Sequence, residues 1–438
     1  MQAPAQSPQA DHHLFLFIEV FGCEGGIQTY VKDVLCAYEA AAQRSTGGYR
    51  YTADVLLLRD PPGCPNPFDL PTLPTLPMLP NPGNSTHVAN PDPPANSDDR
   101  RNSLSQTDHN KRRHRTSRSL FRFHYLKLGQ QKTASAITLS RLRFALALIK
   151  QLLLHRPSCV FCGHINFAAL TRLFCQWFNV PYVVMTYGKE VWDILPPSQV
   201  RALLDAKSLW TISRYSRDRA VASNHLPPEK FQLLPCVVDG DRFTPAPKPV
   251  HLLDRYQLHN ARVLMTVARL WSGDPYKGVD VTIRALPQIA EVYPTVKYLA
   301  IGRGDDLPRL QQLAIDLGVA DRVVFAGFVA TEDLVDHYRV ADAYVMPSQE
   351  GFGIVYLEAM AAGIPVLSGD CDGSADPLQD GRLGWQVPHR DPDAVAAACI
   401  EMLRGDDRRC NGAWLRQETL ASFSTAAIAQ RLRELIAD

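Results

Sequence analysis

The chain has 438 residues, of which 46% are hydrophobic and 21% charged, and its formal net charge is +1. This length exceeds that of one ordinary domain and favours two. The composition is that of a folded globular protein, and the balanced charge excludes a general attraction to nucleic acid or to an acidic partner.

Neither a targeting segment nor a metal site is predicted. Residues 1–12 have no basic start before an apolar core, and no apolar run approaches the ~20 residues of a membrane span. The ten cysteines are scattered. Cys159 and Cys162 form a C-x-x-C, but they lie in an apolar run typical of a buried strand, and no second pair completes a zinc set. We expect structural thiols in a reducing, cytoplasmic compartment.

The first elements follow a disordered tail predicted for residues 1–12. Residues 14–20 form an apolar run of strand length. After a glycine-containing turn, apolar residues recur at helical spacing over residues 27–38, and residues 54–58 predict the next strand. The glycines of that turn therefore lie where a strand gives way to a helix.

A long segment interrupts this pattern from about residue 60 to 118. It is rich in proline, asparagine and serine, and it cannot bury enough apolar surface to offset the entropy lost on ordering. We predict a disordered insertion. Its basic cluster at residues 111–118 favours a solvated charge run, with contact to anionic lipid or nucleic acid as the alternative.

Strands and helices alternate from residue 120 onward. In the first half we predict helices over 134–155, 167–178 and 217–224 and strands over 159–163, 182–186, 208–212 and 231–234. In the second half we predict strands over 263–268, 297–301, 323–326, 343–346 and 365–367, with helices near 278–292, 305–317, 331–341 and 353–362. This alternation predicts an α/β fold with two Rossmann-like, doubly wound parallel sheets.

A Pro-rich join at residues 244–249 indicates a domain boundary. We predict an N-terminal domain over residues 13–247, a C-terminal domain over 248–424 and a last helix over 425–438. Ligands of such sheets bind at the carboxyl ends of strands, so we expect the site in the loops that follow them.

Two of these loops have features of a phosphate site. Gly25 and Gly26 precede a helix whose N-terminal N–H groups suit phosphate, although glycine-rich turns are common in α/β sheets. A second loop has Arg269 and Lys277 at its two ends, where a guanidinium and an ammonium can close on one diphosphate. Two unrelated surface cations are the alternative.

The most specific segment covers residues 347–366. Glu350 ends the loop after a buried strand, and Gly351 and Gly353 flank a helix start with N–H groups for a phosphate. Glu358 is ~6–9 Å further along that helix, where its carboxylate can accept hydrogen bonds from ribose hydroxyls. A favourable interaction with the helix dipole is the simpler explanation of Glu358, but it does not account for the whole segment.

A fourth loop belongs to the first half. Tyr187 and Glu190 follow a predicted strand and offer a hydroxyl and a carboxylate for a sugar, with an ordinary strand-to-loop turn as the alternative. We expect this loop to face the others across an interdomain cleft.

In combination, these segments resemble the retaining glycosyltransferases of family four, which have the two-domain GT-B fold. The resemblance covers most of residues 14–435 apart from the insertion and is strongest over residues 263–393. It is carried by Gly25-Gly26, Val267-Ala-Arg269 with Lys277-Gly278, Ala300-Ile-Gly-Arg-Gly304, Phe325-Ala-Gly-Phe-Val329, and the segment from Glu350 through Glu358 to Gly363-Ile-Pro-Val366.

The resemblance implies a role for each matched position. Glu350, Arg269 and Lys277 would be catalytic, the two cations by stabilising the departing nucleotide. The donor-binding residues would be Gly25, Gly26, Val329, Gly351, Phe352, Gly353, Ile354 and Glu358. Tyr187 and Glu190 would lie on the sugar and acceptor side, and the last helix would cross back to the first domain.

The implied reaction transfers a sugar from a UDP- or GDP-sugar, with retention, to an acceptor sugar or a lipid-linked glycan in polysaccharide or glycoconjugate biosynthesis. No cofactor and no metal are expected, since no Asp-x-Asp motif suited to a metal is predicted in a strand-end loop. The expected partners are the nucleotide-sugar and the glycan or lipid-linked acceptor, and no nucleic acid. Peripheral contact with the inner face of a membrane and the oligomeric state are left open.

Two positions depart from the family pattern. Tyr187-Gly188 replaces a frequent His-Gly, and residues 369–376 replace a Gly-Gly-x-x-Glu loop, with Asp376 as a substitute for the glutamate. Two other functions stay open: a sugar-nucleotide 2-epimerase of the same fold, and a non-catalytic nucleotide-binding scaffold.

Overall fold

The computed structural model describes residues 10–23, 25–44, 48–69, 120–127, 134–273 and 275–437. One compact unit holds the described residues up to Cys64 and from Leu120 onward, and residues 65–119 form a separate unit of which only 65–69 are described. Most of the predicted insertion, its basic cluster included, and residues 1–9 of the predicted tail lie outside the described residues.

Both predicted disordered segments overlap residues that are ordered. The first strand, β1 (Asp11–Phe17), begins inside the predicted tail. Residues 60–69 are described and include the short 3-10 helix η1 (Pro67–Asp69). Asp60 is buried and accepts hydrogen bonds, at 2.5–2.7 Å, from the backbone N–H groups of Val20, Phe21 and Gly22. The start of the predicted insertion therefore shapes the turn after β1.

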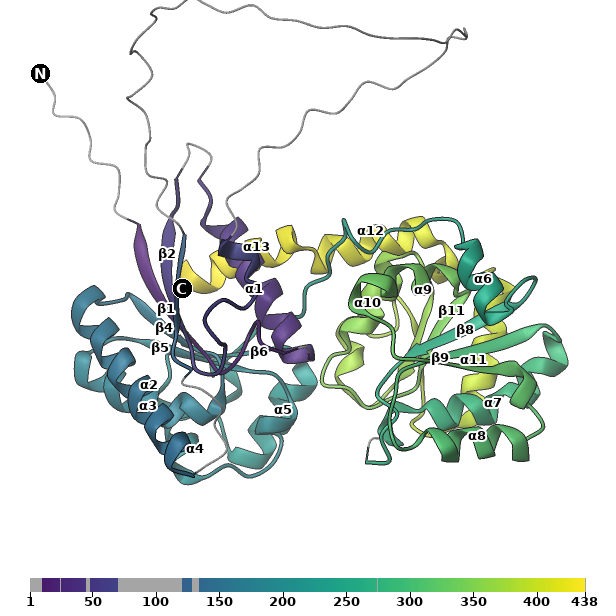
Figure 1. Cartoon of the computed structure of the whole chain (residues 1–438), viewed down its shortest axis with the longest axis horizontal. Coiled ribbons are helices and arrows are strands. Elements are labelled where there is room, and N and C mark those ends of the chain that lie inside the picture. The colour runs from purple at the N-terminus through teal and green to yellow at the C-terminus, as the bar shows by residue number, and fades with distance from the viewer. Residues whose placement is uncertain are drawn as a thin grey trace, which may run out of the picture. The chain divides into compact units, whose positions relative to one another are not determined.

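A parallel sheet with the strand order β3-β2-β1-β4-β5-β6-β7 forms the first half of the compact unit (Figure 1). Its other strands are β2 (Tyr51–Leu57), β3 (Phe121–Tyr125), β4 (Cys159–Cys162), β5 (Tyr182–Thr186), β6 (Ser208–Thr211) and β7 (Phe231–Leu233). Its helices are α1 (Gly26–Ala42), α2 (Ala134–His155), α3 (Ile165–Phe178), α4 (Pro197–Asp205) and α5 (Arg214–Asn224). Every residue of β5 is buried, as expected for a parallel sheet covered on both faces.

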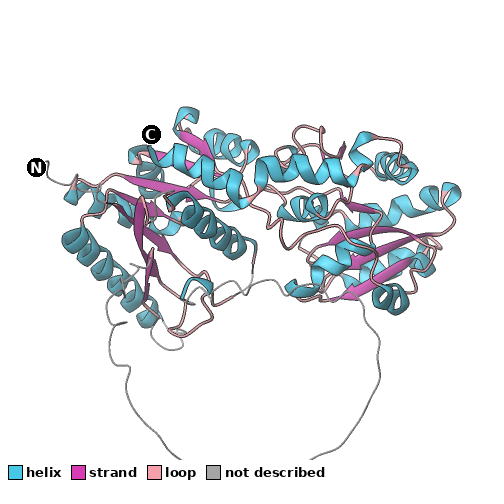
Figure 2. Cartoon of the chain, turned by 90° about the horizontal axis from the view of Figure 1, so that it is seen from above, coloured by secondary structure: helices cyan, strands magenta, loops and turns pink. Residues whose placement is uncertain are grey.

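A second parallel sheet, with the order β10-β9-β8-β11-β12-β13, forms the second half. Its strands are β8 (Arg262–Val267), β9 (Val296–Ile301), β10 (Val323–Gly327), β11 (Ala343–Met346), β12 (Val366–Gly369) and β13 (Trp385–Val387). Its helices are α6 (Val250–Tyr256), α7 (Val279–Val292), α8 (Leu307–Asp316), α9 (Leu334–Val340), α10 (Ile354–Ala361), α11 (Pro392–Arg404) and α12 (Gly412–Phe423). Figure 2 shows helices along the faces of both sheets.

Each sheet has its own apolar core. Leu14, Phe144 and Val184 belong to the core of the first half, and Leu264, Ile289 and Val395 to that of the second. The two parallel sheets confirm the predicted fold class, and α2 has the bounds predicted for it. The prediction missed β3 and β13, which lie at sheet edges, and several helices.

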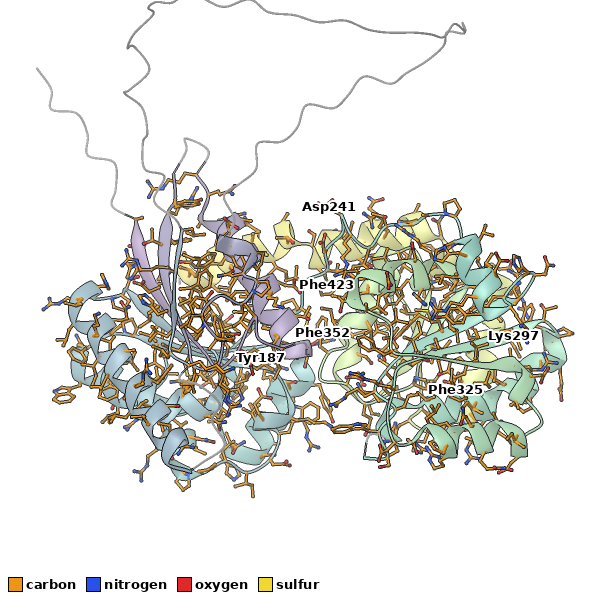
Figure 3. All side chains as sticks on the ribbon, viewed as in Figure 1. Tyr187, Asp241, Lys297, Phe325, Phe352 and Phe423 are labelled. Carbon is orange, nitrogen blue, oxygen red and sulfur yellow. The ribbon has the colours of Figure 1, made fainter. Side chains whose placement is uncertain are left out.

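The last helix, α13 (Thr425–Ala437), packs along α1 of the first half. Its inward side chains are apolar, and Arg431 donates a hydrogen bond to the carbonyl of Leu233 at 3.2 Å. Just before it, Phe423 of α12 lies edge-on to Phe352, with ring centroids 6.0 Å apart (Figure 3). The end of the chain thus contacts both halves.

Candidate active site

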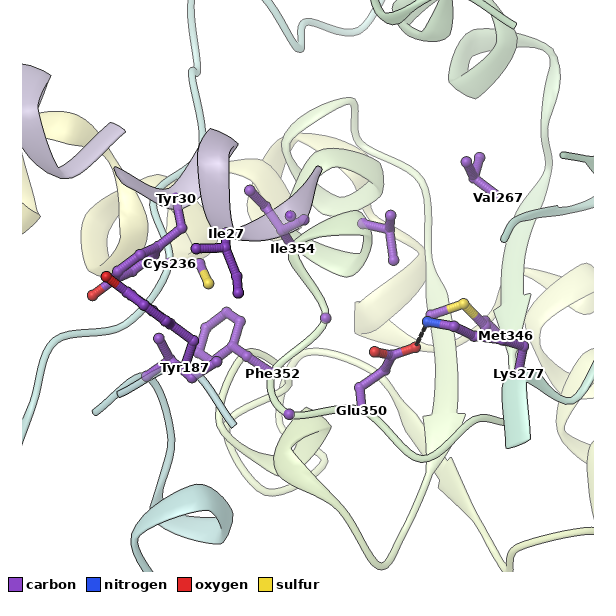
Figure 4. Close-up of a pocket in the computed structure, with 15 residues that line it drawn as sticks. Ile27, Tyr30, Tyr187, Cys236, Val267, Lys277, Met346, Glu350, Phe352 and Ile354 are labelled. Carbon is purple, nitrogen blue, oxygen red and sulfur yellow. Dashed lines mark hydrogen bonds and ion pairs between the residues drawn. The ribbon is translucent and has the colours of Figure 1, made fainter. Parts of the chain in front are cut away.

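A pocket of about 290 Å³ lies between the carboxyl ends of strands from both sheets (Figure 4). The first half contributes Gly26, Ile27, Tyr30, Tyr187, Ile212 and Cys236. The second half contributes Val267, Lys277, Met346 and residues 350–355. The pocket therefore collects residues from all four loops that were predicted to form the site, although Arg269 and Glu190 of those loops are not among its lining residues.

Glu350 and Lys277 form an ion pair at this pocket (Figure 4). Glu350 follows β11, and Lys277 ends the 3-10 helix η4 (Pro275–Lys277), which precedes α7. The two side chains are only 16% and 17% exposed. Because a charge this shielded needs a partner, each one holds the other in place at the edge of the pocket.

The backbone of Glu350 is held by the loop after β12. Asp372 accepts a hydrogen bond from the Glu350 N–H at 2.5 Å, and the Gly373 N–H donates to the Glu350 carbonyl at 2.8 Å. A side chain at residue 373 would put its Cβ 2.0 Å from the Gly351 carbonyl oxygen, so only glycine fits there. Burial raises the pKa of Asp372 to about 6.

From the sequence, we expect no Asp-x-Asp motif suited to a metal ion in a strand-end loop. Asp370 and Asp372 form an Asp-x-Asp motif directly after β12, so such a motif does follow a strand. The two oxygens of Asp372 accept hydrogen bonds from Glu350 and from Ser374. Among the described residues, no cluster of three or more histidine, cysteine or acidic side chains suits a metal ion.

The N-terminus of α10 opens into the pocket. Gly353 caps this helix with φ +91°, a left-handed value that favours glycine. A Cβ at this position would also lie 2.4 Å from the ring of Tyr356. Ile354 and Val355, the first helical residues, line the pocket. N–H groups at a helix start lack intrahelical partners and suit an anion.

Glu358 lies further along α10 and is not part of the pocket lining. Its carboxylate accepts a hydrogen bond from the Tyr338 hydroxyl at 2.7 Å. Burial raises the pKa of Glu358 to about 7, against the opposing effects of Tyr338 and the Arg242 charge. Burial, and then the neighbouring Glu358, raises the pKa of Asp33 in α1 to about 7 as well.

Arg269 and Val329 are not brought to the pocket. Arg269 is exposed, and its guanidinium lies 5.1 Å from the ring centroid of Trp271. It lines a much smaller neighbouring crevice, which Lys277 also reaches. Val329 follows β10 and is partly exposed. Arg269 and Lys277 thus share a crevice, and Lys277 also pairs with Glu350 in the larger pocket.

In the first half, Gly26 and Ile27 begin α1 and line the pocket, whereas Gly25 precedes them outside it. A Cβ on Gly26 would meet no atom within 4 Å, so the backbone faces open space there. The turn leading to these residues is the one that Asp60 fixes. The structure therefore leaves room for a ligand to approach the start of α1.

Tyr187 and Glu190 are engaged within their own half. The Tyr187 hydroxyl donates to the Gly163 carbonyl at 2.7 Å, so its ring rather than its hydroxyl forms the pocket wall. Glu190 accepts a hydrogen bond from the Tyr187 N–H and is absent from the pocket lining. Burial raises the pKa of Glu190. The hydroxyl and the carboxylate are thus engaged within the first half, and the role of this loop towards a sugar stays a prediction.

Several pocket residues were not foreseen. The ring centroids of Tyr30 and Tyr187 are 5.5 Å apart. The Tyr30 hydroxyl donates a hydrogen bond to the Leu234 carbonyl at 2.8 Å. Ile212 follows β6, and Cys236 lies beyond β7. Ile212 could have been predicted from the sequence, because it ends a predicted strand and ligands bind where such strands end. The other two depend on contacts between distant segments.

Comparisons with known proteins identify the family of this chain. The model for "Glycosyl transferases group 1" matches residues 261–405. The GDP-mannose-dependent alpha-(1-6)-phosphatidylinositol monomannoside mannosyltransferase of Mycolicibacterium smegmatis is 37% identical over 58% of this chain and 69% of its own length. The D-inositol 3-phosphate glycosyltransferase of Geodermatophilus obscurus is 35% identical over 46% of this chain and 48% of its own.

Among solved structures, Anabaena Alr3699/HepE in complex with UDP superposes with a TM-score of 0.66 at 17% identity, over 97% of this chain and 99% of its own. At that identity the likeness concerns the fold, which is GT-B. The relatives named above are transferases, so neither the epimerase nor the scaffold receives support from them. The chain belongs to the glycosyl transferases group 1 family and is a glycosyltransferase that uses a nucleotide-sugar donor.

Proposed function

We propose that the chain transfers mannose from GDP-mannose to a mannoside carried by a phosphatidylinositol-type lipid. The observation that carries this proposal is the identity of 37%, 36% and 32% to three relatives from different species, each named as a GDP-mannose-dependent mannosyltransferase acting on a phosphatidylinositol monomannoside. Each alignment covers more than two thirds of the relative.

Lys277, Glu350 and Gly353 line the pocket, whereas Arg269 and Glu358 lie beside it, and each would have a role in this transfer. The bond between the sugar C1 and the diphosphate breaks, and negative charge grows on the departing GDP. The Lys277 ammonium and the helix start at Gly353 would stabilise that charge, and Arg269 would join them by swinging out of its neighbouring crevice. Glu350 would lie beside the transferred sugar, and Glu358 would accept hydrogen bonds from the ribose.

The acceptor oxygen would form its bond to C1 on the face that the phosphate leaves, which retains the anomeric configuration. Its proton would pass to a phosphate oxygen of the departing GDP. The loop of Glu350 therefore has no need of a separate base, and the Asp372 carboxylate, already occupied by N–H groups, would hold that loop rather than a metal ion.

The donor is identified by thermal unfolding with GDP-, UDP- and ADP-sugars, each with and without EDTA. A ligand at a hundredfold excess over its Kd stabilises the fold by ~2.7 kcal/mol. We expect a shift with GDP-mannose alone, unchanged by EDTA. Stabilisation by UDP-sugars instead would refute the donor, and loss of the shift in EDTA would refute metal independence.

A lipid-linked acceptor requires contact with a membrane surface, and α2 has an outer face suited to it. Leu142, Leu146 and Leu153 are 55–58% exposed, on the side opposite the buried Phe144 and Leu148. The helix sequence contains cations but no acidic residue. None of the described helices is long and apolar enough to cross a bilayer. We infer that this face rests on anionic lipid, with leucines inserted and cations at the headgroups.

Vesicle cosedimentation tests this surface. The double variant Leu142→Gln, Leu146→Gln should lose binding to vesicles containing phosphatidylinositol and keep its fold, because both side chains already face outward. Ile315→Gln is the control, since Ile315 is 59% exposed on α8 of the other half. Equal binding by the double variant and the control would refute the surface.

A further inference from the structure

Arg214, the first residue of α5, binds the second half through both its backbone and its side chain. Its N–H donates to a carboxylate oxygen of Asp376 at 2.6 Å, and its Nε donates to the other oxygen. Its two terminal nitrogens bind Asp380 at 2.7 and 3.1 Å. One residue of the first half thus makes four hydrogen bonds to the loop after β12.

The two carboxylates differ in how well water screens them. The Asp376 side chain is 14% exposed, whereas that of Asp380 is 66% exposed. An exposed ion pair contributes little, so the contact to Asp376 is the stronger part of this cluster. Asp380 and Asp376 raise the pKa of Arg214 above its usual range, so Arg214 stays charged.

A short series of backbone hydrogen bonds connects Asp376 to Glu350. The Asp376 N–H donates to the Gly373 carbonyl at 3.3 Å, and the Gly373 N–H donates to the Glu350 carbonyl at 2.8 Å. Asp372 of the same loop accepts the Glu350 N–H. The Ser216 hydroxyl of α5 also reaches the Gly351 carbonyl, at 3.5 Å. The start of α5 therefore supports both loops that shape the pocket around Glu350.

We propose that Arg214 is a positioning residue for Glu350. Its hydrogen bonds to Asp376 hold the loop after β12 in place, and this loop in turn holds the Glu350 backbone. The site is therefore complete only when the two halves are in contact. The proposal rests on the role given to Glu350 above. It explains why Asp376 occupies the place of the family's glutamate, since this carboxylate faces the other half rather than the pocket.

Kinetics of Arg214→Ala, Asp376→Ala and the double variant test the coupling. We expect each single variant to lower kcat by about tenfold to a hundredfold, because small misplacements of a catalytic group are costly. The double variant should be no worse than either single one, since both remove one interaction. The Kd for GDP should stay within twofold, because Lys277 and Gly353 belong to the second half. Arg214→Lys should recover part of kcat.

Arg172→Ala is the matched control, because Arg172 forms an ion pair with Asp205 inside the first half, with side chains 32% and 37% exposed. Unchanged kcat in Arg214→Ala, additive losses in the double variant, or a parallel loss of GDP affinity would each overturn the proposal.

A second measurement does not depend on the donor or on turnover. Hydrogen exchange of the backbone at residues 348–353 should be faster in Arg214→Ala than in the wild type and in Arg172→Ala. Equal exchange would overturn the proposal even if the enzyme uses another sugar. Wild-type protein that transfers no mannose would refute the proposed function alone, since the exchange comparison would still stand.

Discussion

At the scale of single residues, the shielded pair of Lys277 and Glu350 is the centre of the site. The family resemblance implied that both would act on the donor, but the sequence could not show that they bind each other. The pairing crosses from η4 to the loop after β11 and depends on the sheet order, in which β8 and β11 are neighbours. We propose that donor binding shares or replaces this ion pair.

We expect Lys277→Met to abolish transfer and to lower the free energy of unfolding, because Glu350 keeps a shielded charge without its main partner. The loss should be below the ~3–5 kcal/mol of a fully buried pair. Adding Glu350→Gln should restore much of the stability while activity stays lost. Chemical denaturation measures this, and a double variant less stable than Lys277→Met would contradict the explanation.

Glu358 predicts a pH dependence of stability. Its pKa is about 7 in the folded chain against 4.5 when unfolded, so the folded state binds more protons between these values. The free energy of unfolding should fall as pH rises through this window. Glu358→Gln should weaken that fall, although Asp33 titrates in the same range and will keep part of it. Denaturation from pH 4.5 to 8 measures the slope, and Glu229→Gln, at an exposed site, should leave it unchanged.

At the scale of elements, the start of α10 carries the most specific constraint. Gly353 needs both a left-handed backbone and the absence of a Cβ, because the ring of Tyr356 occupies that space. A helix start with glycine and a nearby glutamate could be predicted from the sequence. The contact with Tyr356 could not, since it depends on the rotamer of a side chain within the same helix.

Gly353→Ala should be more destabilising than Gly405→Ala and should weaken GDP binding. Both glycines have positive φ, +91° and +83°, but a Cβ at Gly405 would meet no atom within 4 Å. The left-handed conformation alone costs ~1–2 kcal/mol, so the excess measures the clash with Tyr356. Thermal unfolding measures the loss of stability and GDP titration measures the loss of affinity. Equal losses of stability in the two variants would show that the Tyr356 ring moves aside.

At the scale of the whole molecule, alternating strands and helices predicted two parallel sheets because each long apolar run is buried within one sheet. The prediction was weakest where contacts between distant segments determine whether a strand forms or which partner a side chain binds. The short strands β3 and β13 form only as additions to sheet edges. The sequence could not show that the Tyr187 hydroxyl donates a hydrogen bond to the Gly163 carbonyl, which lies in a distant segment. The sequence places Asp60 in the predicted insertion and does not show its three N–H partners, because they lie some 40 residues earlier.

The segment after Asp60 allows a test of which part of the insertion the fold needs. Removing residues 76–115 should leave the melting temperature and GDP affinity unchanged, because the remaining residues still supply the dozen or more that a parallel crossover from β2 to β3 requires. Asp60→Ala in the full chain should lower the melting temperature and the GDP affinity, since three N–H groups before α1 lose their acceptor. A deletion that unfolds the protein would show that the removed residues are structural.

The packing of α13 along α1 also affects the order in which the protein can fold during synthesis. The first sheet is translated early, yet α13, which covers α1, follows every other described element in the chain. The apolar side chains that α13 buries stay uncovered while the ribosome makes the entire second half. A nascent chain would therefore present this face to chaperones for most of its translation, and loss of the last helix would leave the first half, not the second, prone to aggregation.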